Sequence, residues 1–435
     1  MPRSGSGRHS SPEPEDGEAE SEAAEPRGLA RRLGTADAVV IGVGSMVGAG
    51  VFAVWAPAAK AAGTGLLIGL VLAGFVAYCN ATSSAQLAAV YPVSGGTYVY
   101  GRERLGPWWG FAAGWAFVIG KTASCAAMAL TFATYIVPGH EVVRRLIALA
   151  AVVALAAVNY RGITRTAALT RILVTCTLAV LAVVVVVLLV AGDPSPHRLT
   201  SGSTDLYGIL QAAGLLFFAF AGYARIATMG EEVRDPARTI PRAITIALAV
   251  AIGIYLIIGV TLLLTTTGIA GSNDPLAAAV DAAGAPGVVP IVRVGAALAS
   301  LGALLALIAG IGRTSLAMAR ERDLPGWLAA VHPRYQVPHH AEIALAVVVG
   351  VLVLTTDLRG VIGFSSFGVL LYYAIANASA YTQPPEQRRW PRALNIVGLI
   401  GCVVLAVSLP PPAVLTGAAV LAAGIVARLI LKRRA

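Results

Sequence analysis

The sequence predicts an all-α membrane protein with twelve transmembrane helices. Of its 435 residues, 57% are hydrophobic and 12% are charged, whereas soluble domains carry about 25% charged residues. The hydrophobic residues gather in runs of about 20, the length that an α-helix needs to cross a bilayer. The arginines concentrate in short loops between these runs, which is typical of a protein with many membrane crossings.

The predicted spans follow one another with short connections. They lie at 36–59, 64–90, 107–137, 143–159, 171–191, 207–229, 241–267, 289–318, 341–356, 360–380, 393–409 and 412–431. Residues 1–26 are rich in Glu, Ser, Pro and Ala, so we expect a disordered tail and no secretory signal. The four cysteines fall inside apolar runs without metal-ligand spacing, and we expect them to be core residues.

Charge placement predicts the orientation. The chain ends and the loops after even-numbered spans carry most of the basic residues, whereas the other loops carry Lys60, Arg144, Arg145, Arg198, Arg293 and Arg359. By the positive-inside rule, both termini are cytoplasmic. The net charge of +10 is therefore interpreted as a topology signal and not as a nucleic-acid site.

The first span contains a run that a continuous helix does not favour. Residues 42–52 (GVGSMVGAGVF) hold four glycines, and each costs roughly 1 kcal/mol in a helix interior relative to alanine. We predict that the helix breaks there and leaves N–H and C=O groups facing a cavity. Freed N–H groups suit a carboxylate, and freed carbonyls suit an ammonium group. Close helix packing is the alternative explanation for the same glycines.

A second break is predicted in the sixth span, where residues 217–223 read FFAFAGY. One glycine is weak evidence, but the position is informative because the first and sixth spans are five apart. That spacing fits two inverted repeats, spans 1–5 and 6–10, each opening with a broken helix.

These segments resemble the amino acid–polyamine–organocation superfamily of permeases. The resemblance rests on residues 42–52, on YPVSGGTY at 91–98, on FFAFAGY at 217–223 and on GEEVRDPARTIP at 230–241, and it covers about 35–385. It implies a LeuT-like fold of five-plus-five inverted helices with broken helices 1 and 6. The chain then divides into a cytoplasmic tail (1–34), a ten-helix transporter core (35–385), and two peripheral helices with a short basic C-terminus (386–435).

The resemblance also implies an amino-acid site between the two broken helices, with no metal and no cofactor. Backbone N–H groups around Gly48, Ala49 and Gly50 would take the substrate carboxylate. Carbonyls around Val43, Phe218 and Ala221 would take the α-ammonium group, and Phe220 and Tyr223 would form a lid or wall. The remaining candidate substrate-binding residues are Gly44, Ser45 and Gly222.

The sequence departs from the family at three informative positions. Ala49 stands where relatives often have Ser or Thr, and Ala224 and Arg225 follow Tyr223 where many have an acidic residue. Proton-coupled relatives often place a lysine in the fifth helix, but our alignment puts Thr177 or a neighbour there, and that span has no lysine.

Lys121 lies near the middle of the third span. A lysine at the bilayer centre costs about 2.5–3.5 kcal/mol on insertion scales and is functional by default. Two roles stay open. Lys121 exchanges a proton during the transport cycle, or it stays bonded to the freed carbonyls of the first helix near Val43 or Gly44 as a fixed cation.

Further charged residues are gate candidates at the inner mouth. They are Arg225, Glu231, Glu232, Arg238 and Arg313, with Asp235 as a partner. A solvated charged loop is the alternative.

The predicted function is secondary active transport of amino acids across the plasma membrane by alternating access, with protons as the coupling ion. Neutral substrates are favoured because we expect no Asp or Glu inside a span except Asp37, and a buried cationic side chain normally needs an acidic partner. The alternatives are an exchanger, a transporter of polyamines or cationic amino acids, and a channel or sensor on the same fold. An enzyme is not favoured, because the histidines fall in the tail and loops.

Overall fold

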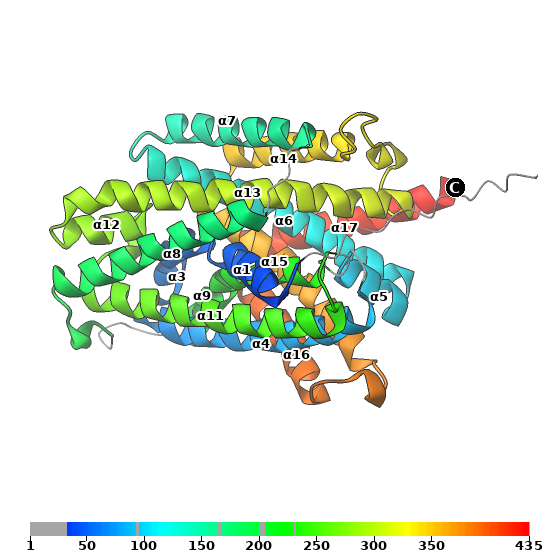
Figure 1. Ribbon diagram of the computed structural model, residues 1–435, viewed down its shortest axis with the longest axis horizontal. Helices are drawn as coiled ribbons and strands as arrows, with labels where there is room; N and C mark the ends of the chain where they lie inside the picture. Colours follow the sequence, from blue (N-terminus) through cyan, green and yellow to red (C-terminus); the bar gives the residue numbers. More distant parts are fainter. Residues whose placement is uncertain (1–32, 93–94, 163–166, 200–204, 230–231, 435) are drawn as a thin grey trace, which may run out of the picture.

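The computed structural model describes residues 33–434 except 93–94, 163–166, 200–204 and 230–231. Its long helices run roughly along one axis as a bundle (Figure 1). The helices in the twelve predicted ranges are α1 (Thr35–Met46), α2 (Gly50–Ala53), α3 (Trp55–Ala62), α4 (Leu66–Val90), α6 (Pro107–Ile136), α7 (Glu141–Tyr160), α8 (Ala167–Val190), α9 (Leu206–Phe220), α10 (Ala224–Ala227), α11 (Pro236–Thr265), α13 (Val289–Arg320), α14 (His339–Thr355), α15 (Leu358–Tyr381), α16 (Arg392–Ser408) and α17 (Pro411–Arg434).

The all-α membrane fold class is confirmed. Within the described residues, nine helical segments are long and apolar enough to cross a membrane, and α14 and α16 are shorter apolar helices. Each predicted range contains helix, but the count of twelve crossings and the inverted repeat stay predictions. The predicted tail lies almost wholly outside the described residues, which begin at Leu33.

Two helices in predicted loops were missed. α5 (Thr97–Leu105) begins after Gly95 and Gly96, both with positive φ, and buries Tyr98 and Tyr100. α12 (Pro275–Ala282) buries Leu276 and Val280. Both helices are shorter than a membrane span, so a search for long apolar runs passes over them.

The prediction that all four cysteines are core residues is wrong for Cys176, which is exposed on α8. Only 28% of the apolar window of α8 is buried within the bundle, so most of its side chains face the surroundings. Lipid-facing and core-facing positions of such a helix are both apolar, and hydropathy alone does not separate them.

The first predicted span is interrupted as the glycine run predicts. α1 ends at Met46, residues 47–49 are non-helical, and α2 starts at Gly50. The sixth span is distorted more mildly. Between α9 and α10, Ala221–Tyr223 forms one turn of 3₁₀-helix, which shifts the backbone hydrogen bonds without unwinding the chain.

The two interrupted segments cross in direct backbone contact. A Cβ atom added to Gly222 would lie 2.3 Å from the Ser45 carbonyl oxygen and 2.7 Å from the Met46 nitrogen. A Cβ atom on Gly44 would lie 2.5 Å from the Val174 side chain on α8. Close packing, the alternative explanation for the glycines, therefore applies at Gly44 and Gly222, and it brings the two helix breaks together.

Replacing Gly222 with alanine should destabilise the fold, because the methyl group would overlap backbone atoms that have no rotamer to change. Overpacking of this kind costs about 1–3 kcal/mol. Thermal unfolding of the purified protein in detergent measures the effect. Gly253→Ala is the matched control, since no atom lies within 4 Å of its added Cβ. Equal melting temperatures for both variants would contradict the contact.

Candidate functional site

At the break in the first span, two backbone N–H groups have no acceptor, whereas nearby carbonyl groups already have donors. The N–H groups of Gly48 and Ala49 have no hydrogen-bond acceptor in the described part of the chain. The Val43 carbonyl accepts from the Val47 N–H at 2.7 Å. The Met46 carbonyl accepts from the Tyr255 hydroxyl on α11 at 2.9 Å. The break thus presents two unpaired donors, the arrangement that attracts an anion.

Small residues bring other helices close to these donors. A Cβ on Gly48 would lie 3.2 Å from the Ala303 side chain on α13, and one on Gly50 would lie 3.1 Å from Ala219 Cα. The Tyr255 ring lies 5.2 Å from the Phe220 ring. α11, α13 and the sixth span therefore enclose the break, and the predicted wall residue Phe220 is fully buried beside it.

On the sixth span, the Ala221 carbonyl carries two hydrogen bonds from side chains. Lys121 Nζ donates to it at 3.2 Å, and the Tyr373 hydroxyl on α15 donates at 3.3 Å. The 3₁₀ turn begins at Ala221, so this carbonyl sits where the regular α-helical pairing changes. Lys121 is 7% exposed and makes no ion pair with any described residue.

This contact corrects the predicted partner of Lys121. We expected its ammonium group to reach the first helix near Val43 or Gly44, but it reaches the sixth span instead. The carbonyls of Val43 and Met46 already have donors from Val47 and Tyr255. The Ala221 carbonyl accepts from Lys121 of α6 and from Tyr373 of α15.

Tyr373 joins the predicted residues and was missed by the sequence analysis. Its ring lies 4.9 Å from Tyr223 and 5.9 Å from Phe217. Tyr373 of α15 thus contacts both Tyr223 and Ala221, and Lys121 binds the same Ala221 carbonyl. Phe218 is buried on the preceding turn. A pair of neighbouring tyrosines in an apolar span, Tyr372 and Tyr373, is the only sequence signal that could have found it.

Thr177 lies beside the first break, where our alignment puts it. A cavity of about 10 Å³ is lined by Gly44, Val47, Gly48 and Thr177. That volume is at the lower limit for one water molecule. The Thr177 hydroxyl bonds to the Leu173 carbonyl of its own helix at 2.8 Å, so the charge that a lysine would supply here is absent.

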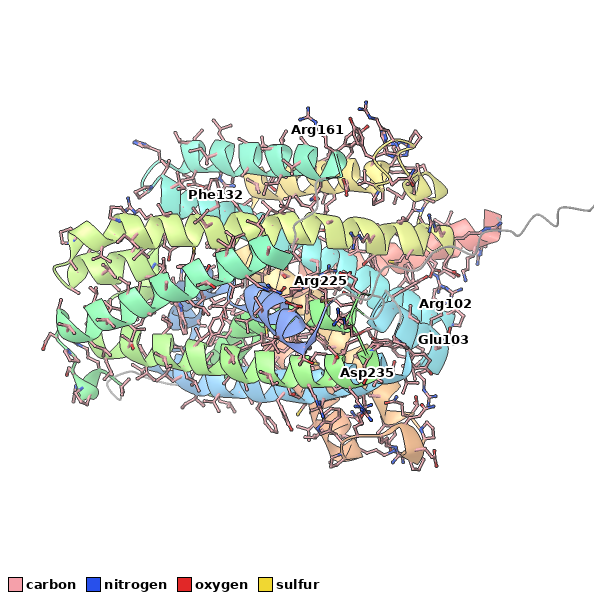
Figure 2. All side chains as sticks on the ribbon, in the orientation of Figure 1. Arg102, Glu103, Phe132, Arg161, Arg225 and Asp235 are labelled. Atoms are coloured by element: carbon pink, nitrogen blue, oxygen red, sulfur yellow. The ribbon has the colours of Figure 1, made fainter. Side chains whose placement is uncertain are left out.

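The gate candidates separate into two groups. Arg225 lies 3.8 Å from Glu232 and ties α10 to the following loop. Among the described residues, Arg238 pairs with Asp235 one turn away, and both side chains are exposed, as the solvated-loop alternative expects. Figure 2 shows Arg225 near the α1 segment and Asp235 at the lower edge of the loop. Arg313 is exposed on α13, and Glu231 lies outside the described residues.

The expectation that no carboxylate except Asp37 lies in a span is wrong. Glu342 falls within the range 341–356 and is 3% exposed in the first turn of α14. It packs against Gly312, where an added Cβ would lie 3.2 Å from Glu342 Cγ. Its charged neighbour is Arg313 on the same helix as Gly312. Glu342 is thus held against α13, on a helix that packs on α7, α6 and α13 and not on the helix breaks.

Comparison with known proteins decides the family. The family profile described as amino acid permease matches residues 33–427. The chain belongs to the amino acid permease family. It is 58% identical to an uncharacterized transporter of Mycobacterium tuberculosis over 94% of both chains. It is 26% identical to a branched-chain amino acid permease of Bacillus subtilis over 86% of this chain and 85% of the relative. It is 28% identical to a vacuolar cationic amino acid transporter of Arabidopsis thaliana over 80% of this chain and 62% of the relative.

Family membership confirms the resemblance to the amino acid–polyamine–organocation superfamily. The permease is a transporter and not an enzyme. Three features lie at the helix breaks of this permease. They are the free amides at Gly48 and Ala49, the packed rings of Phe220 and Tyr255, and the Lys121–Ala221 contact.

Removing the Ala49 donor tests the amide site. Ala49 has φ −58°, close to the value of about −65° that proline requires, so Ala49→Pro deletes the N–H with little backbone strain. Hydrogen bonds to charged groups contribute about 1.5–3 kcal/mol, so amino-acid binding should weaken roughly tenfold to a hundredfold. Ala49→Ser keeps the amide and serves as the control in a radioligand binding assay. Unchanged affinity in Ala49→Pro would rule out this donor.

Proposed function

We propose that the permease is a secondary active transporter that moves neutral amino acids with protons across the plasma membrane by alternating access. The observation that carries the proposal is the buried Lys121 ammonium group on the Ala221 carbonyl, one helix away from two free backbone amides. An ammonium group that gains and loses a proton near an anion site is suited to couple proton and substrate binding.

The substrate carboxylate binds the amides of Gly48, Ala49 and Gly50. Its α-ammonium group uses the carbonyls around Val43 and Phe218, where Val43 offers the lone pair that Val47 leaves open. The Ala221 carbonyl takes no part in this step, because Lys121 and Tyr373 already occupy both of its lone pairs. Ser45 and Gly222 hold the two segments at the crossing, Gly44 packs the first segment against α8, and Phe220 and Tyr223 close the site.

Neutral side chains are favoured because the residues around the crossing are apolar or uncharged, except for the cations Lys121 and Arg225. The buried carboxylate of Glu342 lies against Gly312 and not at the helix breaks. The similarity to a branched-chain amino acid permease supports this choice. The similarity to cationic amino acid transporters keeps a cationic substrate as the second candidate.

Lys121 is the proposed proton carrier. Burying an ammonium group with one carbonyl and no carboxylate is costly, so small changes in its surroundings shift it between its two protonation states. Protonated, Lys121 bonds α6 to the sixth span. Deprotonated, it no longer holds the Ala221 carbonyl as strongly, and the sixth span moves. One proton then accompanies each substrate. Exchange without a proton is the competing mechanism.

The proposed orientation places both termini in the cytoplasm, by the positive-inside rule. The inner gate is then the Arg225–Glu232 pair, with Arg313 close enough to act electrostatically on Arg225. The ten-helix core over 35–385 carries the cycle, and the last two helices over 386–435 are peripheral.

Competition experiments test the substrate class. Alanine or leucine should reduce uptake of a labelled neutral amino acid into proteoliposomes more than arginine, lysine or putrescine does, because the crossing offers no carboxylate to a second cation. The inhibition curve of each competitor is the measurement. Arginine that competes as well as alanine would replace the neutral substrate with a cationic one.

Lys121 variants test the coupling. Lys121→Ala should lose accumulation driven by an imposed pH gradient, and Lys121→Arg, which does not readily deprotonate, should bind substrate but transport it slowly. Accumulation is compared with counterflow exchange, which needs no net proton movement. Full pH-driven accumulation in Lys121→Ala would exclude Lys121 as the proton carrier.

A further inference from the structure

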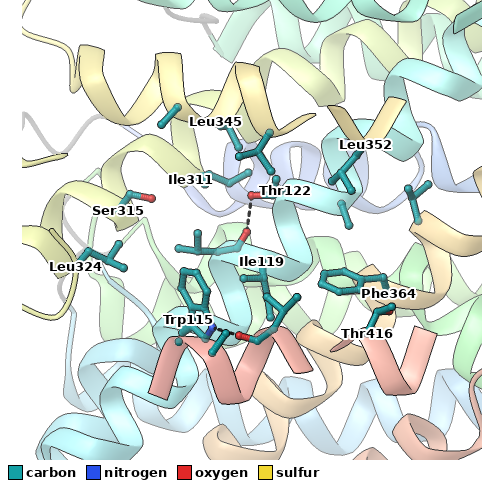
Figure 3. A pocket seen from close by; sticks show the side chains of 18 of the residues that line it. Trp115, Ile119, Thr122, Ile311, Ser315, Leu324, Leu345, Leu352, Phe364 and Thr416 are labelled. Carbon is teal, nitrogen blue, oxygen red and sulfur yellow. Dashed lines mark hydrogen bonds between the residues drawn. The ribbon is translucent and has the colours of Figure 1, made fainter. Parts of the chain in front are cut away.

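A large cavity lies away from the helix breaks. It measures about 1330 Å³ and is lined by residues of α6, α13, α14, α15 and α17. Figure 3 shows α14 with Leu345 and Leu352 on one side and the α17 residue Thr416 on the other. Trp115 and Ile119 of α6 lie between them, with Phe364 of α15. We call this cavity the α14–α17 groove.

The groove extends over most of the membrane thickness. Its lining residues recur every three or four positions from Ala341 to Thr355 on α14 and from Pro412 to Arg428 on α17, so each helix presents one face to it. At 1.5 Å per residue, the stretch on α17 is about 24 Å long. The hydrocarbon core of a bilayer is about 30 Å thick.

The walls of the groove are almost entirely hydrocarbon. Leu345, Val348 and Leu352 line one side, and Ala413, Val420 and Ala423 line the other. Water is not favoured in a groove with such walls. Placing a protein segment with unpaired backbone groups there would cost free energy. An acyl chain has the matching shape and chemistry.

Charged residues line both ends of the groove, Arg145 and Asp357 at one end and Asp323 and Arg428 at the other. Arg428 is fully buried there, with Nη2 2.7 Å from the Asp323 carboxylate and 3.0 Å from the Pro107 carbonyl. Its guanidinium lies 4.3 Å from the Trp108 ring. Its Nη1 atom is buried without a hydrogen-bond partner. Lys432 and Arg433 follow one turn later on α17 and are exposed.

Asp323 does not supply free negative charge at this end. Its carboxylate accepts hydrogen bonds from Arg428, from the Tyr98 hydroxyl at 2.9 Å and from Arg102 at 3.4 Å. Arg428 is buried and paired with Asp323, so the exposed charges of Lys432 and Arg433 remain to attract an anion. Basic residues directly beside a membrane helix recognise anionic headgroups.

We propose that the α14–α17 groove is a binding site for an anionic phospholipid. Its acyl chains lie along α14 and α17, and its phosphate lies beside Arg428, Lys432 and Arg433. The inner leaflet is the side of this headgroup in the proposed orientation, and the choice of leaflet is the one feature of the lipid site that rests on the proposed function. The lipid packs on Ile119 and Thr122, the residues that flank Lys121 on α6, and so it supports the helix that carries the buried ammonium group.

Filling the groove tests the site. The full chain is purified from membranes in a mild detergent, and bound phospholipid is measured by native mass spectrometry. Ala422 and Ala423 are both exposed on α17, but Ala423 lines the groove and Ala422 does not line it. Ala423→Trp should lose the retained lipid, and Ala422→Trp should keep it. Equal lipid retention in the two variants, or none in the wild type, would overturn the proposal. A dimer that only Ala423→Trp abolishes would assign the groove to a second copy instead.

A second experiment tests the headgroup. Delipidated protein is titrated with phosphatidylglycerol or phosphatidylcholine in detergent micelles. Wild type should prefer phosphatidylglycerol, and Arg433→Gln should weaken that lipid roughly fivefold, the effect of about one basic residue near the surface. Arg389→Gln, an exposed arginine in the loop before α16, should have no effect. Equal affinity for both lipids would contradict the role of the basic end. Both readouts measure lipid and not transport, so they stand apart from the proposed transport cycle.

Discussion

The structure depends on the need of every backbone carbonyl in a membrane interior for a donor. The breaks in the first and sixth spans free several carbonyls, and side chains from other helices supply the donors. Tyr255 of α11 bonds to Met46, Tyr135 of α6 bonds to Phe52 at 3.1 Å, and Lys121 and Tyr373 bond to Ala221. The helices that enclose the two breaks are therefore the helices that complete their hydrogen bonding. The amides of Gly48 and Ala49 are left over from this pairing, which is why they are available for a carboxylate.

The sequence alone predicted what depends on local composition. Long apolar runs located the helices, and the four glycines of residues 42–52 located the break, because both signals are contained in one segment. It did not predict the partner of Lys121, because the carbonyls of the first helix have other donors. Tyr255, far along the chain, donates to Met46, and Val47, within the same segment, donates to Val43. It also missed Tyr373, whose role follows from its distance to Tyr223 and Ala221. Glu342 was overlooked because one acidic residue at the start of an apolar run hardly changes its hydropathy, although burial against Gly312 makes it part of the interior.

One wall of the site is fixed to its neighbours by a buried polar cluster. Asn377, one turn after Tyr373 on α15, donates to Asn80 of α4 at 2.6 Å and accepts from Ser83 at 2.7 Å. Asn395 of α16 donates to Ser83 at 2.6 Å. Hydrogen bonds between membrane helices hold them in register, so α4, α15 and α16 form one unit. Tyr373 supplies the hydrogen bond from that unit to Ala221, and α4 and α16 also pack against the sixth span, at Ala213 and Gly214. A movement of the sixth span relative to this unit therefore either breaks the hydrogen bond from Tyr373 to Ala221 or moves the Tyr373 side chain with it. Lys121 binds the same carbonyl.

The first and sixth spans are joined at a second place besides their crossing at Gly222. Leu33, directly before α1, donates to the Glu232 carbonyl at 3.1 Å and accepts from the Arg234 N–H at 2.9 Å. This short bridge lies in the loop that also holds the Arg225–Glu232 ion pair, and Asp37 in the first turn of α1 pairs with Arg171 of α8. The two spans are therefore attached at two points, one at the crossing and one at the end of the segments. The bond between Lys121 and Ala221 lies on the sixth span, directly beside its crossing with the first span at Gly222.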